Sequence, residues 1–170
     1  MINVYLPCVG SYNRQFVCDE VSAEICLWCD RYGDCKLVVA GDLNVNLDSS
    51  DIIARSIFNF TQNYSLSRCD ELFPSEKVPT YVNNALQQQS QIDYILVSSG
   101  CAVNSFSVAD PDINFSDHLP LLADVVCRVP TGLMGKNVVK SDQVPKQYFL
   151  CWDKAYRNGY YKYTGDSITH

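Results

Sequence analysis

Hydrophobic and polar positions along the first forty residues predict three elements in succession. Residues 2–6 alternate and are rich in strand formers, with Pro7 directly after them, so they predict a strand. From about residue 13 to residue 32, apolar residues recur near helical spacing and charged residues fill the other face, which predicts an amphipathic helix. The run at 36–41 is short and unbroken in its hydrophobicity, as in a buried strand. The apolar positions of the helix are Phe16, Val17, Val21, Ile25 and Trp28.

The pattern continues with a second helix and then with strands. A cap at Ser49, Ser50 or Asp51 predicts a helix that runs to about Tyr64. Its expected inward residues are Ile52, Ile53, Ile57, Phe58 and Phe60. Further strands are expected at about 79–83, 91–98, 102–108 and 119–128, with a polar loop over 83–91. Strand and helix alternate first and several strands follow, which predicts an α/β, layered α+β fold.

The compact pattern ends near Pro130, and the charge changes sign there. Residues 1–127 hold 6 Lys or Arg and 16 Asp or Glu, a balance of −10, whereas residues 128–170 hold 7 and 3, a balance of +4. We therefore predict one domain over 1–128 and a basic, tyrosine-rich connector or tail over 129–170. An acidic body is by itself a poor non-specific binder of DNA, because phosphate contacts need cations.

The nine cysteines are odd in number, and the first residues resemble neither a signal peptide nor a membrane span. We expect an intracellular protein that is not secreted and does not contact a membrane, with cysteines that are reduced and largely buried. Cys26 and Cys29 form a CxxC pair, and Cys35 follows soon after. A zinc site is one interpretation of this cluster, and small hydrophobic side chains on a helix are the other.

Polar groups interrupt three of the predicted strands. Asp42 and Asn44 follow the buried strand at 36–41, Asp93 is the one charge inside an apolar strand, and Asp117 and His118 precede the last strand. An unpaired buried acid costs several kcal/mol, so Asp93 needs a partner.

His118 can be that partner, because Asp93 can accept a hydrogen bond from one ring nitrogen and so orient the imidazole. Asp42, Asn44 and Asp117 are hard oxygen ligands that suit Mg²⁺. Together the groups predict metal-assisted hydrolysis of a phosphodiester. Each also has a plainer interpretation: a capped turn for Asp42 and Asn44, an ion pair for Asp93, and a structural histidine for His118.

Five segments in order resemble the C-terminal half of the endonuclease/exonuclease/phosphatase superfamily. They are INVYLP, LVVAGDLN, the Thr-Tyr of 80–81, SQIDYILVS and SDHLPLLADV, and they cover about residues 1–128. The resemblance implies half of a four-layer αββα sandwich and Mg²⁺- or Mn²⁺-dependent nicking of DNA. Segments 149–155 and 160–164 resemble the connector after the AP-endonuclease-like domain of LINE-like non-LTR retrotransposons, whose polyproteins also contain a reverse transcriptase. A nuclear location is implied only by this resemblance.

The resemblance also implies roles for individual residues. Tyr5, Asp42, Asn44, Asp93 and His118 are similar to the family's catalytic residues, and Asp42, Asn44, Asp117 and His118 are similar to residues on its metal side. Tyr5 would lie near the scissile phosphate, Asp42 would activate water or handle the proton of the leaving group, and His118 would contact the phosphate.

The family's N-terminal half, with the glutamate of its QE-type metal-binding motif, has no counterpart in these residues. We therefore expect a truncated endonuclease of weak or no activity, with one sheet face left exposed for a complementing half or for self-association. One alternative is a non-catalytic interaction module, decayed or domesticated. Another is a different phosphodiesterase or phosphatase of the same superfamily.

Overall fold

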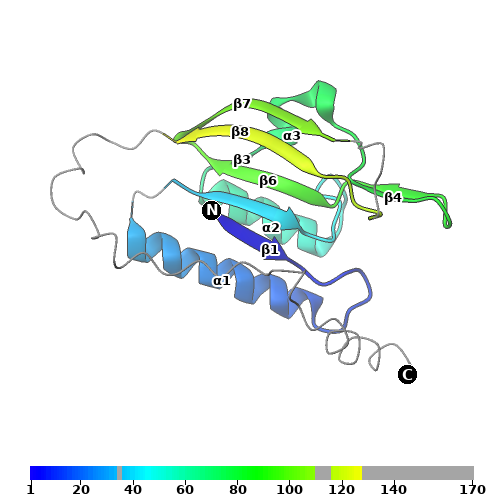
Figure 1. Cartoon of the computed structure of the whole chain (residues 1–170). Helices are drawn as coiled ribbons and strands as arrows, with labels where there is room; N and C mark the ends of the chain where they lie inside the picture. Colours follow the sequence, from blue (N-terminus) through cyan, green and yellow to red (C-terminus); the bar gives the residue numbers. More distant parts are fainter. Residues whose placement is uncertain (34–35, 110–115, 128–170) are drawn as a thin grey trace, which may run out of the picture. The chain divides into compact units, whose positions relative to one another are not determined.

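The computed structural model describes residues 1–33, 36–109 and 116–127, and its centre is a four-stranded sheet (Figure 1). The strands are β1 (Ile2–Tyr5), β2 (Val38–Asp42), β6 (Asp93–Ser98) and β3 (Leu66–Arg68), in the order β1-β2-β6-β3. β1 and β2 are parallel, whereas β6 is antiparallel to both β2 and β3. The predicted tail at 129–170 lies outside the described residues.

Two helices cover one face of this sheet. They are α1 (Arg14–Tyr32) and α2 (Ile52–Asn63), and Asp51 caps α2 by accepting a 2.7 Å hydrogen bond from the Ile53 amide. Side chains alternate across a strand, so every second residue of the sheet faces the helices. The resulting core joins helix and strand residues, among them Cys18, Ile25, Ile53, Ile57, Val4, Val39, Tyr94 and Leu96.

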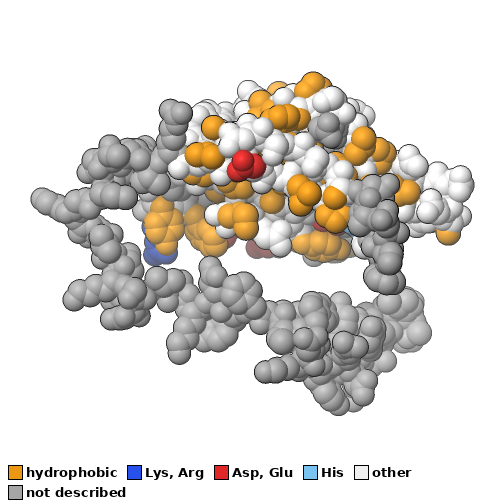
Figure 2. Space-filling model, turned by 45° about the horizontal axis from the view of Figure 1, so that its top comes forward, with side chains coloured by type: hydrophobic (Ala, Val, Ile, Leu, Met, Phe, Trp, Pro, Cys, Tyr) orange, Lys and Arg blue, Asp and Glu red, His pale blue; other side chains and the backbone are white. Residues whose placement is uncertain are grey.

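A β-hairpin packs on the opposite face of the sheet. Its strands β7 (Cys101–Val108) and β8 (Leu121–Cys127) are antiparallel, and Phe106 packs with Val97 of β6 in a second core cluster. The hairpin therefore covers part of the face that the sequence predicted to be exposed. Its own outer side carries the exposed Leu122 and Val126, and Figure 2 shows hydrophobic side chains with few charged ones on this side.

The remaining elements are short. They are β4 (Tyr81–Asn83), β5 (Gln88–Ser90), α3 (Cys69–Leu72) and the 3₁₀ turn Pro74–Glu76. β4 and β5 pair with each other and project from the body (Figure 1). The predicted loop at 83–91 is thus wrong in part, because β5 lies inside it. β3 and α3 were not predicted.

The layered α+β fold is confirmed, with a mixed sheet between helices and a hairpin. The predicted inward faces of the helices are wrong at four positions. Ile52 is 65% exposed and Phe58 59% exposed, and Phe16 and Trp28 are also exposed. Apolar residues occur on both sides of each helix, and contact with one sheet face can bury only one side.

The cysteine prediction holds for some residues only. Cys18 and Cys69 are buried, whereas Cys8 and Cys127 are exposed. Cys26 lies on α1 with Cys29, and no group of metal-ligating side chains among the described residues includes either. Across the part of the chain that the structure describes, helices are too short or too polar to cross a membrane.

Candidate active site

Asp42 and Asp93 lie side by side because of the register of two strands. Asp42 is the last residue of β2 and Asp93 the first of β6, and they are direct partners in the antiparallel pairing. Direct partners point to the same face of a sheet, and here this is the face that carries the hairpin. Gly41 permits the close approach of β1, because its φ is +142° and a Cβ there would collide with the Val4 carbonyl oxygen.

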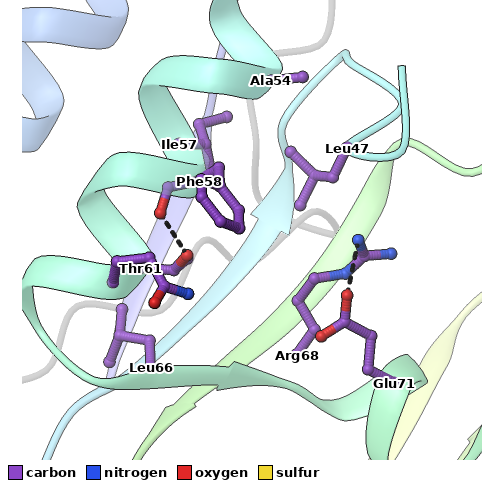
Figure 3. A pocket seen from close by; sticks show the side chains of 9 residues that line it. Leu47, Ala54, Ile57, Phe58, Thr61, Leu66, Arg68 and Glu71 are labelled. Carbon is purple, nitrogen blue, oxygen red and sulfur yellow. Dashed lines mark hydrogen bonds and ion pairs between the residues drawn. The ribbon is translucent and has the colours of Figure 1, made fainter. Parts of the chain in front are cut away.

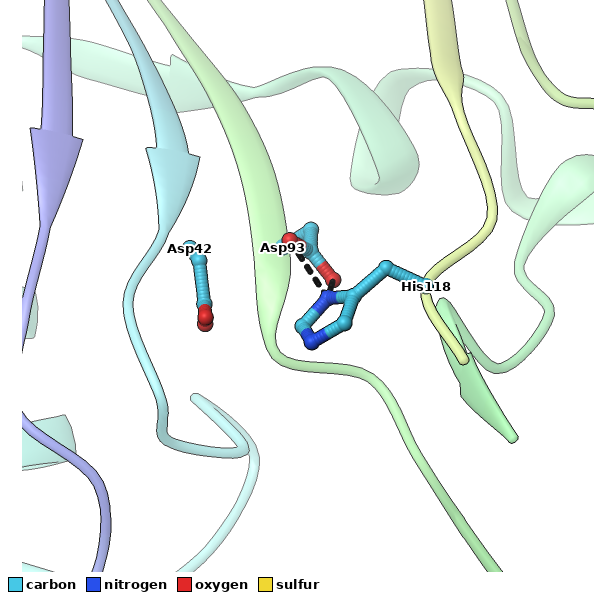
Figure 4. Close-up of side chains that lie close together, drawn as sticks. All are labelled: Asp42, Asp93 and His118. Carbon is cyan, nitrogen blue, oxygen red and sulfur yellow. Dashed lines mark hydrogen bonds and ion pairs between the residues drawn. The ribbon is translucent and has the colours of Figure 1, made fainter. Parts of the chain in front are cut away.

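His118 reaches this strand end from the segment that precedes β8 (Figure 4). Its Nδ1 lies 2.9 Å from Asp93 Oδ2 and 3.2 Å from Asp93 Oδ1. The backbone around it is held by β4, because the Val82 amide donates to the Asp117 carbonyl at 2.8 Å and the Leu119 amide donates to the Thr80 carbonyl at 2.7 Å. Asp93 therefore fixes the imidazole orientation through Nδ1, as a carboxylate partner does for many functional histidines.

Thr80 completes this half of the site, although its residue type and position in the sequence predicted no role for it. Its hydroxyl donates to Asp93 Oδ2 at 2.7 Å and accepts from the Ile92 and Asp93 amides at 3.1 Å each. The side chain is fully buried. Tyr81 adds an edge-on ring contact to His118, with centroids 5.3 Å apart. The Pro79-Thr80-Tyr81 segment carried the only sequence signal, as part of the resemblance.

Asn44 holds both carboxylate oxygens of Asp42. Its backbone amide donates to Oδ1 at 2.8 Å, and its side-chain amide donates to Oδ2 at 2.9 Å and to the Leu6 carbonyl at 2.8 Å. The backbone of Asn44 is left-handed, with φ of 50°, a conformation that asparagine tolerates better than most residues. Burial raises the pKa of Asp42 above its usual value, and the hydrogen bond from the Asn44 amide opposes that rise.

Arg14 supports the Asn44 backbone from the first turn of α1. Its guanidinium donates to the Asn44 carbonyl at 2.9 Å and to Asp51 Oδ2 at 2.9 Å. The Arg14 side chain is largely buried. One side chain thus joins α1, the cap of α2 and the loop that carries Asn44.

A second polar network supports the same loop from the other side. The Tyr94 hydroxyl accepts from the Leu47 amide at 3.0 Å and donates to the Gln91 carbonyl at 2.8 Å. Arg68 lies over the Tyr94 ring at 5.1 Å and donates to Asp48 Oδ1 at 2.7 Å. Burial raises the pKa of Tyr94 to about 12, so its hydroxyl keeps its proton as a donor.

A small pocket beside this network has a volume of about 70 Å³ (Figure 3). Arg68 and Glu71 form an ion pair at its edge, and the rest of its wall comes mainly from α2 and from Leu47. The sequence predicted no site here. The Arg68 guanidinium is already paired with Asp70, Asp48 and Glu71, which indicates a structural role.

One group of side chains in the described residues can hold a metal ion. Asp42, Asp93 and His118 each offer a ligand atom, and these atoms lie within 4.8 Å of one another. Carboxylate oxygen and imidazole nitrogen are ordinary ligands of divalent cations, so the donor set fits one.

The other predicted residues lie around this group. The exposed Asp117 is not part of it and contacts β4 through its backbone carbonyl. Tyr5 is the strand partner of Asp42 in β1 and is 69% exposed, so it borders the same face. Asn44 contacts the group through Asp42. The roles of all these residues stay predictions.

Residues 28–118 match the endonuclease/exonuclease/phosphatase family, and the chain belongs to this family. A search of curated proteins gave no match. Members of the family include phosphodiesterases and phosphatases, and they generally depend on divalent metals.

Solved structures share the fold at low sequence identity. The 3′-5′ exonuclease NExo from Neisseria meningitidis matches with a TM-score of 0.57 and 20% identity, over 72% of this chain and 59% of that one. The endonuclease domain of TRAS1, a telomere-specific non-LTR retrotransposon, matches with a TM-score of 0.52 and 18% identity, over 63% of this chain and 51% of that one. The mannosyl-6-phosphatase of Bacteroides thetaiotaomicron matches with a TM-score of 0.52 and 18% identity, over 73% of this chain and 49% of that one. The chain spans about half the length of such structures.

Proposed function

We propose that this chain carries the catalytic centre of a metal-dependent DNA endonuclease of the non-LTR retrotransposon type. The observation that carries the proposal is the convergence of Asp42, Asp93 and His118 from three separate segments, with Asp93 orienting His118 through Nδ1. Solved structures with this fold include a retrotransposon endonuclease domain and a Neisseria 3′ phosphatase bound to a product DNA hairpin, and they support the choice of DNA as substrate.

A divalent cation, Mg²⁺ or Mn²⁺, would bind among Asp42, Asp93 and His118, with the carboxylates of Asp42 and Asp93 as its nearest oxygen donors. The bound cation would supply Lewis-acid stabilisation of charge on the phosphoryl oxygens. Asp42 is suited to take a proton from water, because burial raises the pKa of its carboxyl and Asn44 fixes the orientation of both oxygens. His118, oriented by Asp93 through Nδ1, would contact the phosphate that is cleaved through Nε2.

We expect only weak nicking from this chain alone. Its 170 residues contain no counterpart of the family's QE-type glutamate. Even changes to groups that only orient metal ligands commonly cost about 10- to 100-fold in activity. A complementing half, or a second copy seated on the exposed part of the sheet face near Tyr5, is expected to raise the activity.

The test is nicking of supercoiled plasmid by the purified chain with Mg²⁺, with Mn²⁺ or with EDTA. Conversion to open circles with either metal and none with EDTA is the expected result. Parallel assays with a phosphate monoester and with RNA separate the alternatives, since faster turnover of either one would indicate another hydrolase of the family. A folded chain that cleaves none of these substrates would contradict the proposal and favour a non-catalytic interaction module.

A further inference from the structure

The hairpin of β7 and β8 holds a pair of cysteines at the end farthest from the segment that carries His118. Cys101 opens β7 and Cys127 closes β8, and the two are direct partners in the antiparallel pairing. Their Sγ atoms lie 3.1 Å apart. No described residue of the candidate active site contacts them, and the proposed function makes no use of them.

We propose that Cys101 and Cys127 are a thiol–disulfide site, which a low-molecular-weight disulfide such as oxidised glutathione converts into a cross-strand disulfide. Residues directly opposite in an antiparallel pair have Cβ atoms about 4.5–5.5 Å apart, close to the 3.5–4.5 Å of a disulfide. Closing the sulfur separation from 3.1 Å to the ~2.05 Å of an S–S bond requires a movement of about 1 Å. Rotation of the side chains supplies such a movement without a change of register.

The two thiols are also accessible to such a reagent. Cys127 is exposed and Cys101 is half-buried, whereas Cys18 and Cys69 are buried. Ser98 Oγ lies 3.8 Å from Cys101 Sγ. The hydrogen bond with Cys101, together with partial desolvation, raises the pKa of Cys127, so thiolate is scarce at neutral pH and exchange is faster in mildly alkaline buffer. The positive charges of Lys36 and of the amino group of Met1 also act on Cys127 and lower its pKa slightly.

The exchange has two steps. A thiolate of one cysteine attacks a sulfur of oxidised glutathione, an S–S bond forms to the protein, and one glutathione leaves as its thiolate. The second protein thiolate then attacks the protein sulfur of that mixed disulfide and displaces the second glutathione. The two protein thiols lose two electrons and two protons in total, and one molecule of oxidised glutathione is reduced to two thiols.

The bond would close a loop that contains the segment with His118, which lies between β7 and β8. Cross-linking the two ends of such a loop restricts the unfolded chain, and the gain grows with loop length. For a loop of about 25 residues in a domain of this size, a Tm higher by about 10 °C is expected in the oxidised form. The pair lies at the strand ends farthest from Val108 and Leu121, so the bond should tie the hairpin without changing the contact of His118 with Asp93.

The experiment incubates the full folded chain with oxidised glutathione, then unfolds it in denaturant and alkylates the remaining thiols. We expect peptide mapping to find Cys101 joined to Cys127, alkylation to fall from nine cysteines to seven, and Tm to rise until dithiothreitol is added. Cys101→Ser and Cys127→Ser should each abolish both changes. Cys8→Ser, at an exposed cysteine remote from the hairpin in sequence, should keep them.

Two results would overturn the proposal. One is a map in which the folded chain carries Cys101 and Cys127 only as separate glutathione adducts, or joined to other cysteines. The other is a Tm rise of the same size in Cys101→Ser. Peptide mapping of the parent chain, which carries no substitution and has been treated with oxidised glutathione, decides between these outcomes even if a serine variant fails to fold.

Discussion

The two halves of the candidate site are built in different ways. In the first half, Asp42 and Asn44 are two residues apart, and Asn44 binds both oxygens of its neighbour. In the second half, Thr80, Asp93 and His118 come from three segments that meet only in the folded chain. The first half is a local turn that contacts with Leu6 and Arg14 hold in place, and the second depends on the β4 segment, on the start of β6 and on the segment before β8. A change to any residue that joins two of these segments should therefore affect both activity and folding.

The largest expected effect is that of His118→Ala on plasmid nicking. Loss of a group that contacts the phosphate should reduce the rate by about 100- to 10,000-fold. The matched control is His170→Ala, the other histidine of the chain, which should nick as the parent does. Equal rates for His118→Ala and the parent would show that the second half of the site does no chemistry.

Thr80→Val should cost stability as well as activity. The substitution keeps the shape of the side chain but leaves the Ile92 and Asp93 amides without this acceptor and removes one of the two donors to the Asp93 carboxylate, the other being His118. Because Thr80 is fully buried, we expect the free energy of unfolding to fall by at least about 1–3 kcal/mol in urea. Thr80→Ser keeps the hydroxyl and should recover most of the hydrogen-bond contribution. A valine variant as stable as the serine variant would contradict this role.

Arg14→Met tests the support of the first half. The change removes the donor to the Asn44 carbonyl and to Asp51, and a loss of about 1–2 kcal/mol in unfolding free energy is expected. Nicking should also slow, because Asn44 orients Asp42. Arg55→Met on the exposed side of α2 is the control, and it should change neither quantity. If the two methionine variants behave alike, Arg14 does not position the loop.

The smallest effect concerns pH. Hydrogen bonds from Arg68 and from Lys77 lower the pKa of Asp48 below its ordinary 3.8. A carboxyl whose folded pKa is depressed stabilises the fold above its unfolded pKa, and this contribution is lost as pH falls through the folded value. Asp48→Asn should therefore flatten the decline in stability below about pH 4, measured by urea unfolding at several pH values. Lys77→Met should flatten it in part, and an unchanged decline in both variants would refute the coupling.

The sequence predicted those parts of the fold and site that depend on near neighbours. The helix cap was predicted at Ser49, Ser50 or Asp51 and lies at Asp51, and the strand predicted at 36–41 is observed at Val38–Asp42. Both features, and the Asp42–Asn44 spacing, need only a few adjacent residues. The pairing of Asp93 with His118 was also predicted, because a lone acid in an apolar strand requires a partner.

Other features depend on contacts that a linear pattern does not contain. Thr80 is 13 residues from Asp93, and Arg14 is 30 residues from Asn44. Nothing in the local pattern of either residue indicates the partner. The exposed Ile52 and Phe58 follow helical spacing, but the sheet buries only the other side of α2. The strand β5 has a polar, glutamine-rich sequence, and it is fixed by its pairing with β4.

The most direct test of the assembled site is the tautomer of His118, measured by long-range ¹H–¹⁵N NMR of the imidazole in the intact chain. Only two histidines contribute signals, so His118→Ala assigns them. We expect His118 to carry its proton on Nδ1, which donates to Asp93, and to lose that preference in Asp93→Ala. An imidazole of His118 that carries its proton on Nε2 alone in the parent chain, unchanged in Asp93→Ala, would show that Asp93 does not orient it.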